Sequence, residues 1–61
     1  MTDPRPVDML LRGYGVDDVR VKTGLSYGTI ATRISMSPHR EALEPWRKLA
    51  LAMAQAERGA A

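Results

Sequence analysis

Apolar residues recur along this chain at spacings of three and four, and no stretch alternates apolar and polar residues between turn residues. The first spacing is typical of one face of an α-helix, whereas strict alternation is typical of a half-buried strand. Val16 and Val19, followed by Thr23, show the helical spacing. The pattern therefore predicts an all-α fold, a small three- to four-helix bundle that forms a single domain over residues 1–61.

The first predicted helix precedes a glycine-rich turn at residues 13–15. Proline is favourable in the first turn of a helix because that turn leaves its N–H groups unpaired in any case. We expect the helix to run from Pro4 or Pro6 to Arg12, with Thr2 or Asp3 as its cap. Its apolar face is expected to comprise Val7, Leu10 and Leu11.

Two further helices are predicted on either side of Gly24, over residues 16–23 and about 27–35. Gly24 suits the left-handed position that ends many helices, because it has no Cβ to clash there. Ser26 suits the start of the next helix, because its hydroxyl oxygen can accept a hydrogen bond from an unpaired backbone N–H. Ile30 and Ile34, one turn apart, are expected on the inner side of that helix.

The C-terminal third contains two prolines, Pro38 and Pro45, that interrupt the helical pattern. Proline inside a helix costs about 3 kcal/mol, so one unbroken helix is disfavoured. We expect one short turn over residues 38–43, capped by Ser37, and then a helix over about 45–58 with Gly59 behind it. One apolar stripe of this helix comprises Trp46, Leu49, Ala50 and Met53.

Around Gly24, five residues occupy positions whose spacing has a physical reason. Gly24 permits a positive φ, so the chain can turn sharply between two helices. Leu25 and Val19 fill the wedge between these helices, and Ile30 closes it from the second helix. Ser26 satisfies N–H groups at the start of that helix.

With these residues, segment 16–35 resembles the helix-turn-helix of bacterial and phage transcription regulators. The resemblance covers about a third of the chain. It implies a sequence-preferring regulator that binds double-stranded DNA, with helix 27–35 in the major groove. Arg20 departs from the family pattern, which has alanine there, so its side chain must bend outward or the helices must splay. The inward position late in the second helix falls on Ile34, next to Arg33.

The resemblance implies two sets of DNA-contacting residues. The first set lies on helix 27–35 and its cap, where outward side chains reach base edges. It comprises Ser26, Tyr27, Gly28, Ala31, Thr32 and Ser35. The second set is basic and contacts phosphate, which supplies affinity rather than sequence information. It comprises Arg20, Lys22, Arg33, His39 and Arg40. Each Lys or Arg of this set can equally belong to a solvated face, and His39 is expected to be an ordinary exposed loop histidine rather than a contact. Tyr27 can equally be a surface aromatic that leans on the preceding helix.

Charge and composition narrow the function classes. Four basic and four acidic residues balance up to Ile30, whereas five basic face three acidic residues from Ala31 onward, which accounts for the whole net charge of +2. Such an excess suits a surface that meets phosphate. The chain has no Cys and one His, which excludes thiolate and multi-histidine zinc sites, so no metal or cofactor is expected. The sequence Gly13-Tyr14-Gly15 has the first two glycines of a dinucleotide-binding loop but lacks the third. Because no other catalytic motif is present, we do not expect an enzyme.

Location follows from the absence of long apolar runs. No segment approaches the ~20 apolar residues that span a bilayer, and residues 1–6 lack a signal-peptide core. A chain without Cys also suits a reducing compartment. We expect a cytoplasmic protein that does not enter a membrane.

Two alternatives remain open at this point. The residues around Gly24 also fit an ordinary helical corner, and the chain is then a small protein-interaction adaptor that uses the helix of Trp46. Within the DNA-binding hypothesis, a homodimer through the C-terminal helix is expected, because two copies pair two recognition helices on a palindromic site. The residues considered for that contact are Trp46, Leu49 and Met53, although we expect them in the core rather than at an interface. Leu43, Leu51 and Val21 fall off the main stripes and are candidates for the same patch.

Overall fold

The computed structural model describes residues 5–59, and this part of the chain consists of four α-helices joined by turns, without a strand. The helices are α1 (Arg5–Leu11), α2 (Val16–Thr23), α3 (Tyr27–Ser35) and α4 (Glu44–Gly59). The predicted all-α class is therefore confirmed. The cap assigned to Thr2 or Asp3 lies outside the described residues.

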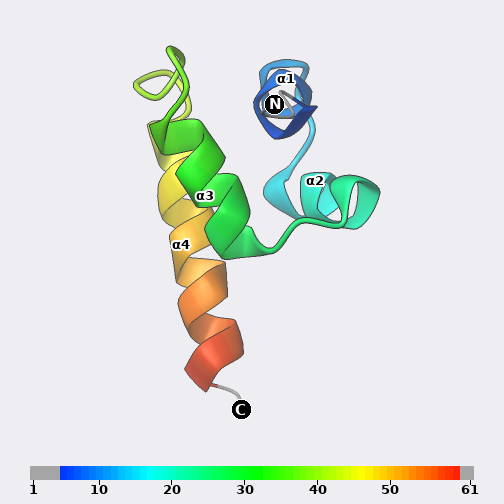
Figure 1. Cartoon of the computed structure of the whole chain (residues 1–61), viewed down its shortest axis with the longest axis vertical. Coiled ribbons are helices and arrows are strands. Elements are labelled where there is room, and N and C mark those ends of the chain that lie inside the picture. The colour runs from blue at the N-terminus through cyan, green and yellow to red at the C-terminus, as the bar shows by residue number, and fades with distance from the viewer. Residues whose placement is uncertain (1–4, 60–61) are drawn as a thin grey trace.

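The helices form two pairs (Figure 1). α3 and α4 run side by side in opposite directions and make the most extensive contact in the fold. α1 and α2 pack against one side of this pair, and α4 continues past the beginning of α3 toward the C-terminus. Between residues 5 and 59, no helix combines the length and the apolar character that crossing a bilayer requires.

The core lies where α3 meets the other three helices. Ile30 and Ile34 are fully buried, as the helical spacing predicts, and Val19 on α2 is buried against them. Leu43, which falls off the predicted stripes, is buried just before α4 begins. Several apolar side chains pack around this core while partly exposed: Val7, Met9, Leu25, Trp46 and Met53.

The buried side of α4 differs from the predicted stripe. Ala50 and Ala54 face α3 and are buried, whereas Leu49 is 50% exposed. The expectation that Leu49 lies in the core is therefore wrong. The reason is that Leu43 fixes the start of α4, and Ala50 and Ala54, seven and eleven residues later, follow it on the same side of a helix.

α1 shows a smaller difference of the same kind. Leu10 is buried as predicted, but Leu11 is 46% exposed, and Pro6 is buried instead. Pro6 and Leu10 are four residues apart and therefore share one side of the helix. Gly13 follows with φ 102°, so a glycine turns the chain after α1 as predicted.

The connection between α3 and α4 contains turns but no helix. The Ser37 Oγ accepts a hydrogen bond from the His39 N–H at 2.9 Å, which is the predicted cap. The Leu43 N–H donates to the His39 carbonyl at 3.0 Å, so residues 38–43 form the expected short turn. α4 then runs from Glu44 to Gly59, one residue longer at each end than predicted, a difference within the usual variation of helix ends.

Candidate nucleic-acid interface

The turn between α2 and α3 has the local geometry that its residues predict. Gly24 adopts φ 75° and ψ 7°, and its N–H donates to the Arg20 carbonyl at 2.9 Å, which ends α2. The Thr23 hydroxyl donates to the Val19 carbonyl at 2.6 Å and accepts from the Leu25 N–H at 3.2 Å. Thr23 thus fixes both sides of the turn, a role that the spacing of apolar residues does not indicate.

Ser26 begins α3 as predicted. Its Oγ accepts a hydrogen bond from the Thr29 N–H at 3.3 Å, and it also lies 2.9 Å from the Thr29 hydroxyl. These contacts satisfy one of the N–H groups that the first turn of a helix leaves unpaired. The start of α3 is therefore determined by its own sequence as well as by packing.

α3 divides into a covered side and an exposed side. The covered side comprises Tyr27, Ile30, Ala31 and Ile34. The other side, which we call the open face, is exposed or half-exposed and comprises Gly28, Thr29, Thr32, Ser35 and Met36, the last being the residue that caps α3. Sequence reasoning placed Gly28, Thr32 and Ser35 outward correctly but missed Thr29 and Met36. Met36 follows Thr32 by one helical turn, a signal that was present in the spacing.

Tyr27 and Ala31 correct the sequence-based assignment. Both were predicted to face outward toward base edges, yet only 8% of Tyr27 and 2% of Ala31 is exposed. Tyr27 lies one turn from Ile30, and Ala31 lies one turn from Ile34, all on the buried side of α3. They therefore belong to the core and offer no surface to a ligand in this conformation.

The beginning of α3 is tied to its neighbours by four side chains, which we call the α3 clasp: Asp17, Arg20, Tyr27 and Glu57. The Tyr27 hydroxyl donates a hydrogen bond to the Asp17 carboxylate. The Arg20 guanidinium lies over the Tyr27 ring, 5.0 Å from its centroid, and its Nη2 forms an ion pair with Glu57 Oε1 at 3.4 Å. The clasp thus joins α2, α3 and α4 at one end of the bundle.

The clasp changes the acidity of Tyr27. Donation to Asp17 raises the pKa of the Tyr27 hydroxyl, because ionisation would remove the donated proton and leave two anions side by side. Desolvation of the ring acts in the same direction. The hydroxyl is therefore held in its neutral form over a wider pH range than in the unfolded chain.

Arg20 extends from α2 toward the other members of the α3 clasp. Its side chain is about half-exposed, crosses the Tyr27 ring of α3 and reaches Glu57 on α4. Its Nε is buried and has no hydrogen-bond partner among the described residues. Arg20, predicted to contact phosphate, is therefore already engaged with an acidic side chain and an aromatic ring.

The other predicted phosphate contacts lie on separate elements. Lys22 is exposed on α2, with its Nζ 5.8 Å from the centroid of the Tyr14 ring. Arg33 is half-buried at the edge of the open face. His39 and Arg40 are exposed in the turns that follow α3. From Lys22 to Arg40 the chain has three Lys or Arg and no Asp or Glu, so this segment carries +3 whereas the whole chain carries +2.

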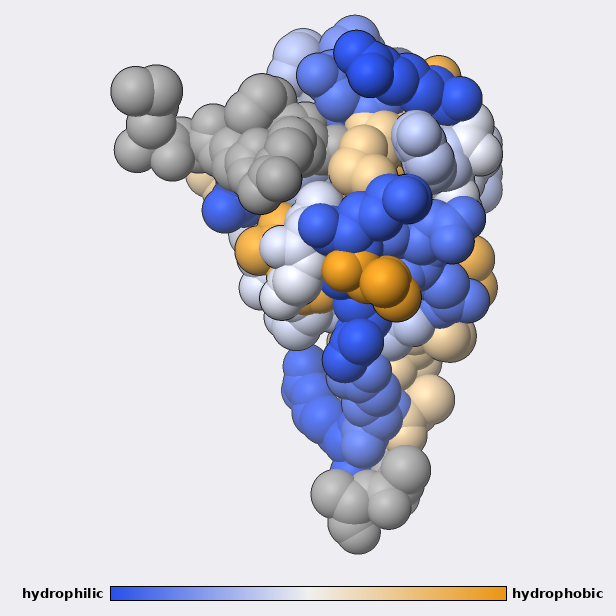
Figure 2. All heavy atoms as spheres, turned by 90° about the vertical axis from the view of Figure 1, so that its right-hand side faces the viewer, coloured by the Kyte–Doolittle hydropathy of each residue, from blue (hydrophilic) through white to orange (hydrophobic). Residues whose placement is uncertain are grey.

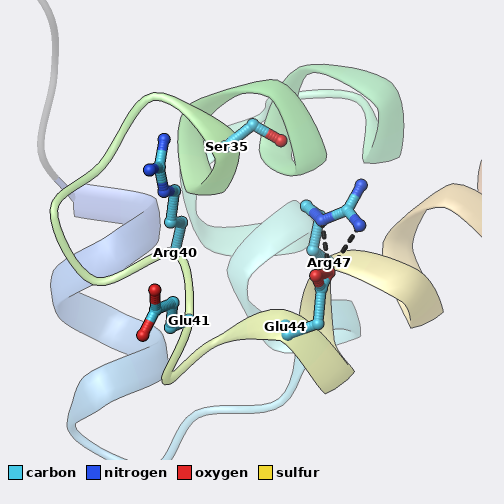
Figure 3. A pocket seen from close by; sticks show the side chains of 5 residues that line it. All are labelled: Ser35, Arg40, Glu41, Glu44 and Arg47. Atoms are coloured by element: carbon cyan, nitrogen blue, oxygen red, sulfur yellow. Dashed lines mark hydrogen bonds and ion pairs between the residues drawn. The ribbon is translucent and has the colours of Figure 1, made fainter.

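A hollow of about 310 Å³ lies where the end of α3, the following turns and the start of α4 meet (Figure 3). Its lining comprises Ser35, Arg40, Glu41, Glu44 and Arg47. Arg47 is neutralised by Glu44, since its Nε and Nη2 both lie 2.5 Å from Glu44 Oε1. No ion pair joins Arg40 to another residue of segment 5–59, and its guanidinium diverges from Glu41 (Figure 3). The hollow is of mixed charge, with Arg40 as its unneutralised cation.

α4 carries an exposed apolar strip on the side away from α3. Pro45, Leu49, Ala52 and Ala56 follow one another at i, i+4, i+7 and i+11, and all are exposed. In Figure 2, apolar atoms run along one side of the lower part of α4 and hydrophilic atoms along the other. Trp46 and Met53, considered for a dimer contact, are half-buried against the core, so Leu49 is the large side chain that this strip leaves exposed.

Comparisons of the chain with protein-family models, curated proteins and solved structures found no match. Function must therefore be inferred from the chain's own residues and geometry.

Proposed function

We propose that this chain is a DNA-binding module, a sequence-preferring transcriptional regulator of prokaryotic or phage type. In this proposal α2 and α3 form a helix-turn-helix, and the open face of α3 enters the major groove of double-stranded DNA. The observation that carries the proposal is the combination of an uncovered helix face with an acid-free segment from Lys22 to Arg40. Neither a metal nor a cofactor takes part.

The dimensions and side chains of α3 support this proposal. An α-helix with its side chains is about 10–12 Å across, close to the width of about 12 Å of the major groove. The open face contains glycine, two threonines and a serine, which are small enough to let the helix backbone approach the bases. The open face itself carries no carboxylate to repel phosphate, and the next one along the chain is Glu41, in the turns that follow α3.

Phosphate contacts come from the basic residues around the open face. Lys22, Arg33 and Arg40 supply charge, and His39 contributes a hydrogen-bond donor next to Arg40. Counterion release on binding makes such contacts dependent on salt, with a slope of log K against log salt of about −0.9 per phosphate contact. With three to four contacts, affinity is expected to fall steeply as salt rises.

Titration with duplex DNA at several salt concentrations tests the proposal. We expect measurable binding at low salt and a steep loss of affinity as salt rises. Thr32→Glu places a carboxylate on the open face and should abolish binding by repelling phosphate. Gln55→Glu makes the same change of net charge at an exposed position of α4 and is the matched control, which should bind nearly as the parent does. If the parent chain binds no duplex at low salt, DNA binding is excluded.

The apolar strip on α4 supports two further expectations. In the DNA-binding proposal it pairs two copies, with Leu49 of one chain against the small side chains Ala52 and Ala56 of the other. A homodimer doubles the phosphate contacts and pairs two recognition helices. Leu49→Glu should then keep the chain monomeric in sedimentation equilibrium and weaken DNA binding.

The same strip favours the second candidate function, a small helical adaptor that binds another protein. An adaptor needs no DNA, so the two functions separate in the titration above. Leu49→Glu abolishes the adaptor's contact with its partner, whereas Thr32→Glu leaves it intact. If the chain binds DNA, Thr32→Glu should reduce its affinity for DNA more than Leu49→Glu does.

A further inference from the structure

The open face of α3 lacks the side chains that form paired hydrogen bonds with bases. Arginine or lysine recognises guanine in this way, and asparagine or glutamine recognises adenine. Of the five residues on the open face, none is of these types, and the chain contains no Asn and a single Gln, at position 55 on α4. Arg33 lies at the edge of the open face, half-buried. Sequence preference on this face must therefore come from another kind of contact.

Both threonine hydroxyls of the open face are turned back onto α3 or its cap, Ser26. The Thr32 hydroxyl donates to the Gly28 carbonyl at 3.0 Å. The Thr29 hydroxyl lies in hydrogen-bond contact with Ser26 Oγ at 2.9 Å. Because each threonine Cβ carries one hydroxyl and one methyl group, a hydroxyl committed to the helix leaves the methyl as the other group that the residue can present.

Met36 adds an apolar side chain to the same face. It lies one turn beyond Thr32, is 78% exposed, and is not among the residues that pack against the core. A long apolar side chain left in water at the end of a helix gains free energy when a partner covers it. Thr32 and Met36 together form a short methyl-bearing row along the exposed side of α3.

We propose that this row recognises the 5-methyl groups of thymine, so that the module prefers A·T-rich duplex DNA. This inference rests on the proposed DNA-binding function and specifies which duplex the module prefers. Thymine is the one standard base that presents an apolar group in the major groove, and apolar side chains contact it there. The acid-free segment from Lys22 to Arg40 makes a polyanion the fitting occupant of this face rather than an acidic or neutral protein surface.

The experiment compares four duplexes of equal length and matched sequence. The first contains only A·T pairs, and the second replaces every thymine by uracil, which removes the 5-methyl group and leaves the hydrogen-bonding groups unchanged. The third contains only G·C pairs, and the fourth replaces its cytosines by 5-methylcytosine, which restores a methyl group at the same edge of the groove. Each methyl group buried is worth about fourfold in affinity. We expect the thymine duplex to bind about 4- to 16-fold more tightly than the uracil duplex, and 5-methylcytosine to strengthen binding to the G·C duplex.

Two variants test whether Thr32 and Met36 cause the preference for thymine over uracil. Thr32→Ser removes the methyl group and keeps the hydroxyl that bonds to Gly28, so it leaves the helix intact. Met36→Ala removes the thioether from a position that contributes little to the core. Each should reduce the ratio of thymine to uracil affinity by about fourfold. Val21→Ala, which removes methyl groups from an exposed side chain on α2 outside the open face, is the control and should keep the ratio.

The outcomes separate this inference from the function on which it rests. Equal affinity for the thymine and uracil duplexes overturns methyl recognition and leaves DNA binding in place. A thymine preference that survives both variants overturns the assignment to Thr32 and Met36. Failure of the parent chain to bind any of the four duplexes at low salt overturns the proposed function itself and favours the adaptor, which contacts its partner through the strip on α4.

Discussion

The two ends of α3 are held in different ways. At its beginning, the Tyr27 side chain is buried, bonded to Asp17, and covered by an arginine that pairs with Glu57. At its end, Ser35 and Met36 are exposed, and the turns that follow carry Arg40 without an ion pair to the rest of segment 5–59. One helix therefore has an anchored end and an open end.

Two arginines show the consequence of these different surroundings. Arg20 and Arg40 both lie close to α3 and both looked like phosphate contacts in the sequence. Arg20 stands beside the anchored end, where Glu57 and the Tyr27 ring engage its charge. Arg40 stands beside the open end and keeps its charge exposed. The availability of a cation depends on what the fold brings next to it, and residue type alone does not reveal it.

A substitution in the turn that leads into the anchored end should change the free energy of unfolding the most. Gly24→Val should lower the free energy of unfolding by at least about 1–2 kcal/mol, because φ 75° is unfavourable for a residue with a Cβ, and most of all for a β-branched one. No atom lies within 4 Å of a Cβ added at Gly24, so the cost is conformational rather than a clash. Urea unfolding followed by circular dichroism measures it.

Gly28→Ala is the matched control for that substitution. Gly28 also has open space around an added Cβ, but it lies inside α3 with an ordinary helical backbone. Alanine there should raise the free energy of unfolding by about 0.5–1 kcal/mol. A Gly24→Val chain as stable as the parent would show that the turn does not require its left-handed residue.

The next effect concerns the Tyr27 hydroxyl. Tyr27→Phe removes the donor to Asp17 and should lower the melting temperature, by less than Gly24→Val does. The folded-state pKa of Tyr27 is raised above the ordinary value of 10.0, so the stability that this contact contributes is complete below pH 10 and is lost as pH rises through the folded-state pKa. The difference in stability between the parent and Tyr27→Phe should therefore shrink at strongly alkaline pH. A difference that stays constant with pH for Tyr27→Phe would contradict the clasp.

Local features of the anchored end were predictable from the sequence, because they depend on residues close together in the chain. The left-handed Gly24, the Ser26 cap and the burial of Ile30 and Ile34 are of this kind. The outward assignment of Tyr27 came from resemblance to a motif. The spacing of the apolar residues on α3 points the other way, since Tyr27, Ile30, Ala31 and Ile34 form one helical stripe. Helical periodicity proved the better guide to burial.

The arrangement of α4 could not be predicted in the same way. Leu49 and Ala54 both continue apolar stripes of this helix, so the sequence offers two sides that can face α3. The choice depends on Leu43, which is buried before the helix starts and sets its rotation. The ion pair from Arg20 to Glu57 depends on this rotation as well, because its partners are 37 positions apart. Contacts of this range follow from the packed fold rather than from local spacing.

A smaller effect is expected for the outer part of the clasp. Glu57→Gln removes the ion pair with Arg20, whose two partners are each about half-exposed, so the free energy of unfolding should fall by no more than about 1 kcal/mol. High salt should reduce the difference from the parent, since it screens exposed charges. Glu41→Gln, at an exposed position without an ion pair within residues 5–59, is the control and should leave stability unchanged at either salt concentration. If both substitutions changed the free energy of unfolding equally, Glu57 would not contribute to holding the anchored end.

Arg40→Ala should have the smallest effect on stability. It also tests most directly whether the two ends of α3 differ. Its side chain is exposed, so the free energy of unfolding should change by less than about 0.5 kcal/mol. If the open end contacts phosphate, the same substitution should weaken binding to all duplexes alike and reduce the slope of log K against log salt by about 1. Arg20→Ala should behave in the opposite way. It should lower stability and leave the slope of log K against log salt unchanged, because the Arg20 guanidinium already forms an ion pair with Glu57. Should Arg20→Ala reduce the slope while Arg40→Ala does not, DNA would have to displace Glu57, and the anchored end of α3 would be the one that meets the phosphate backbone.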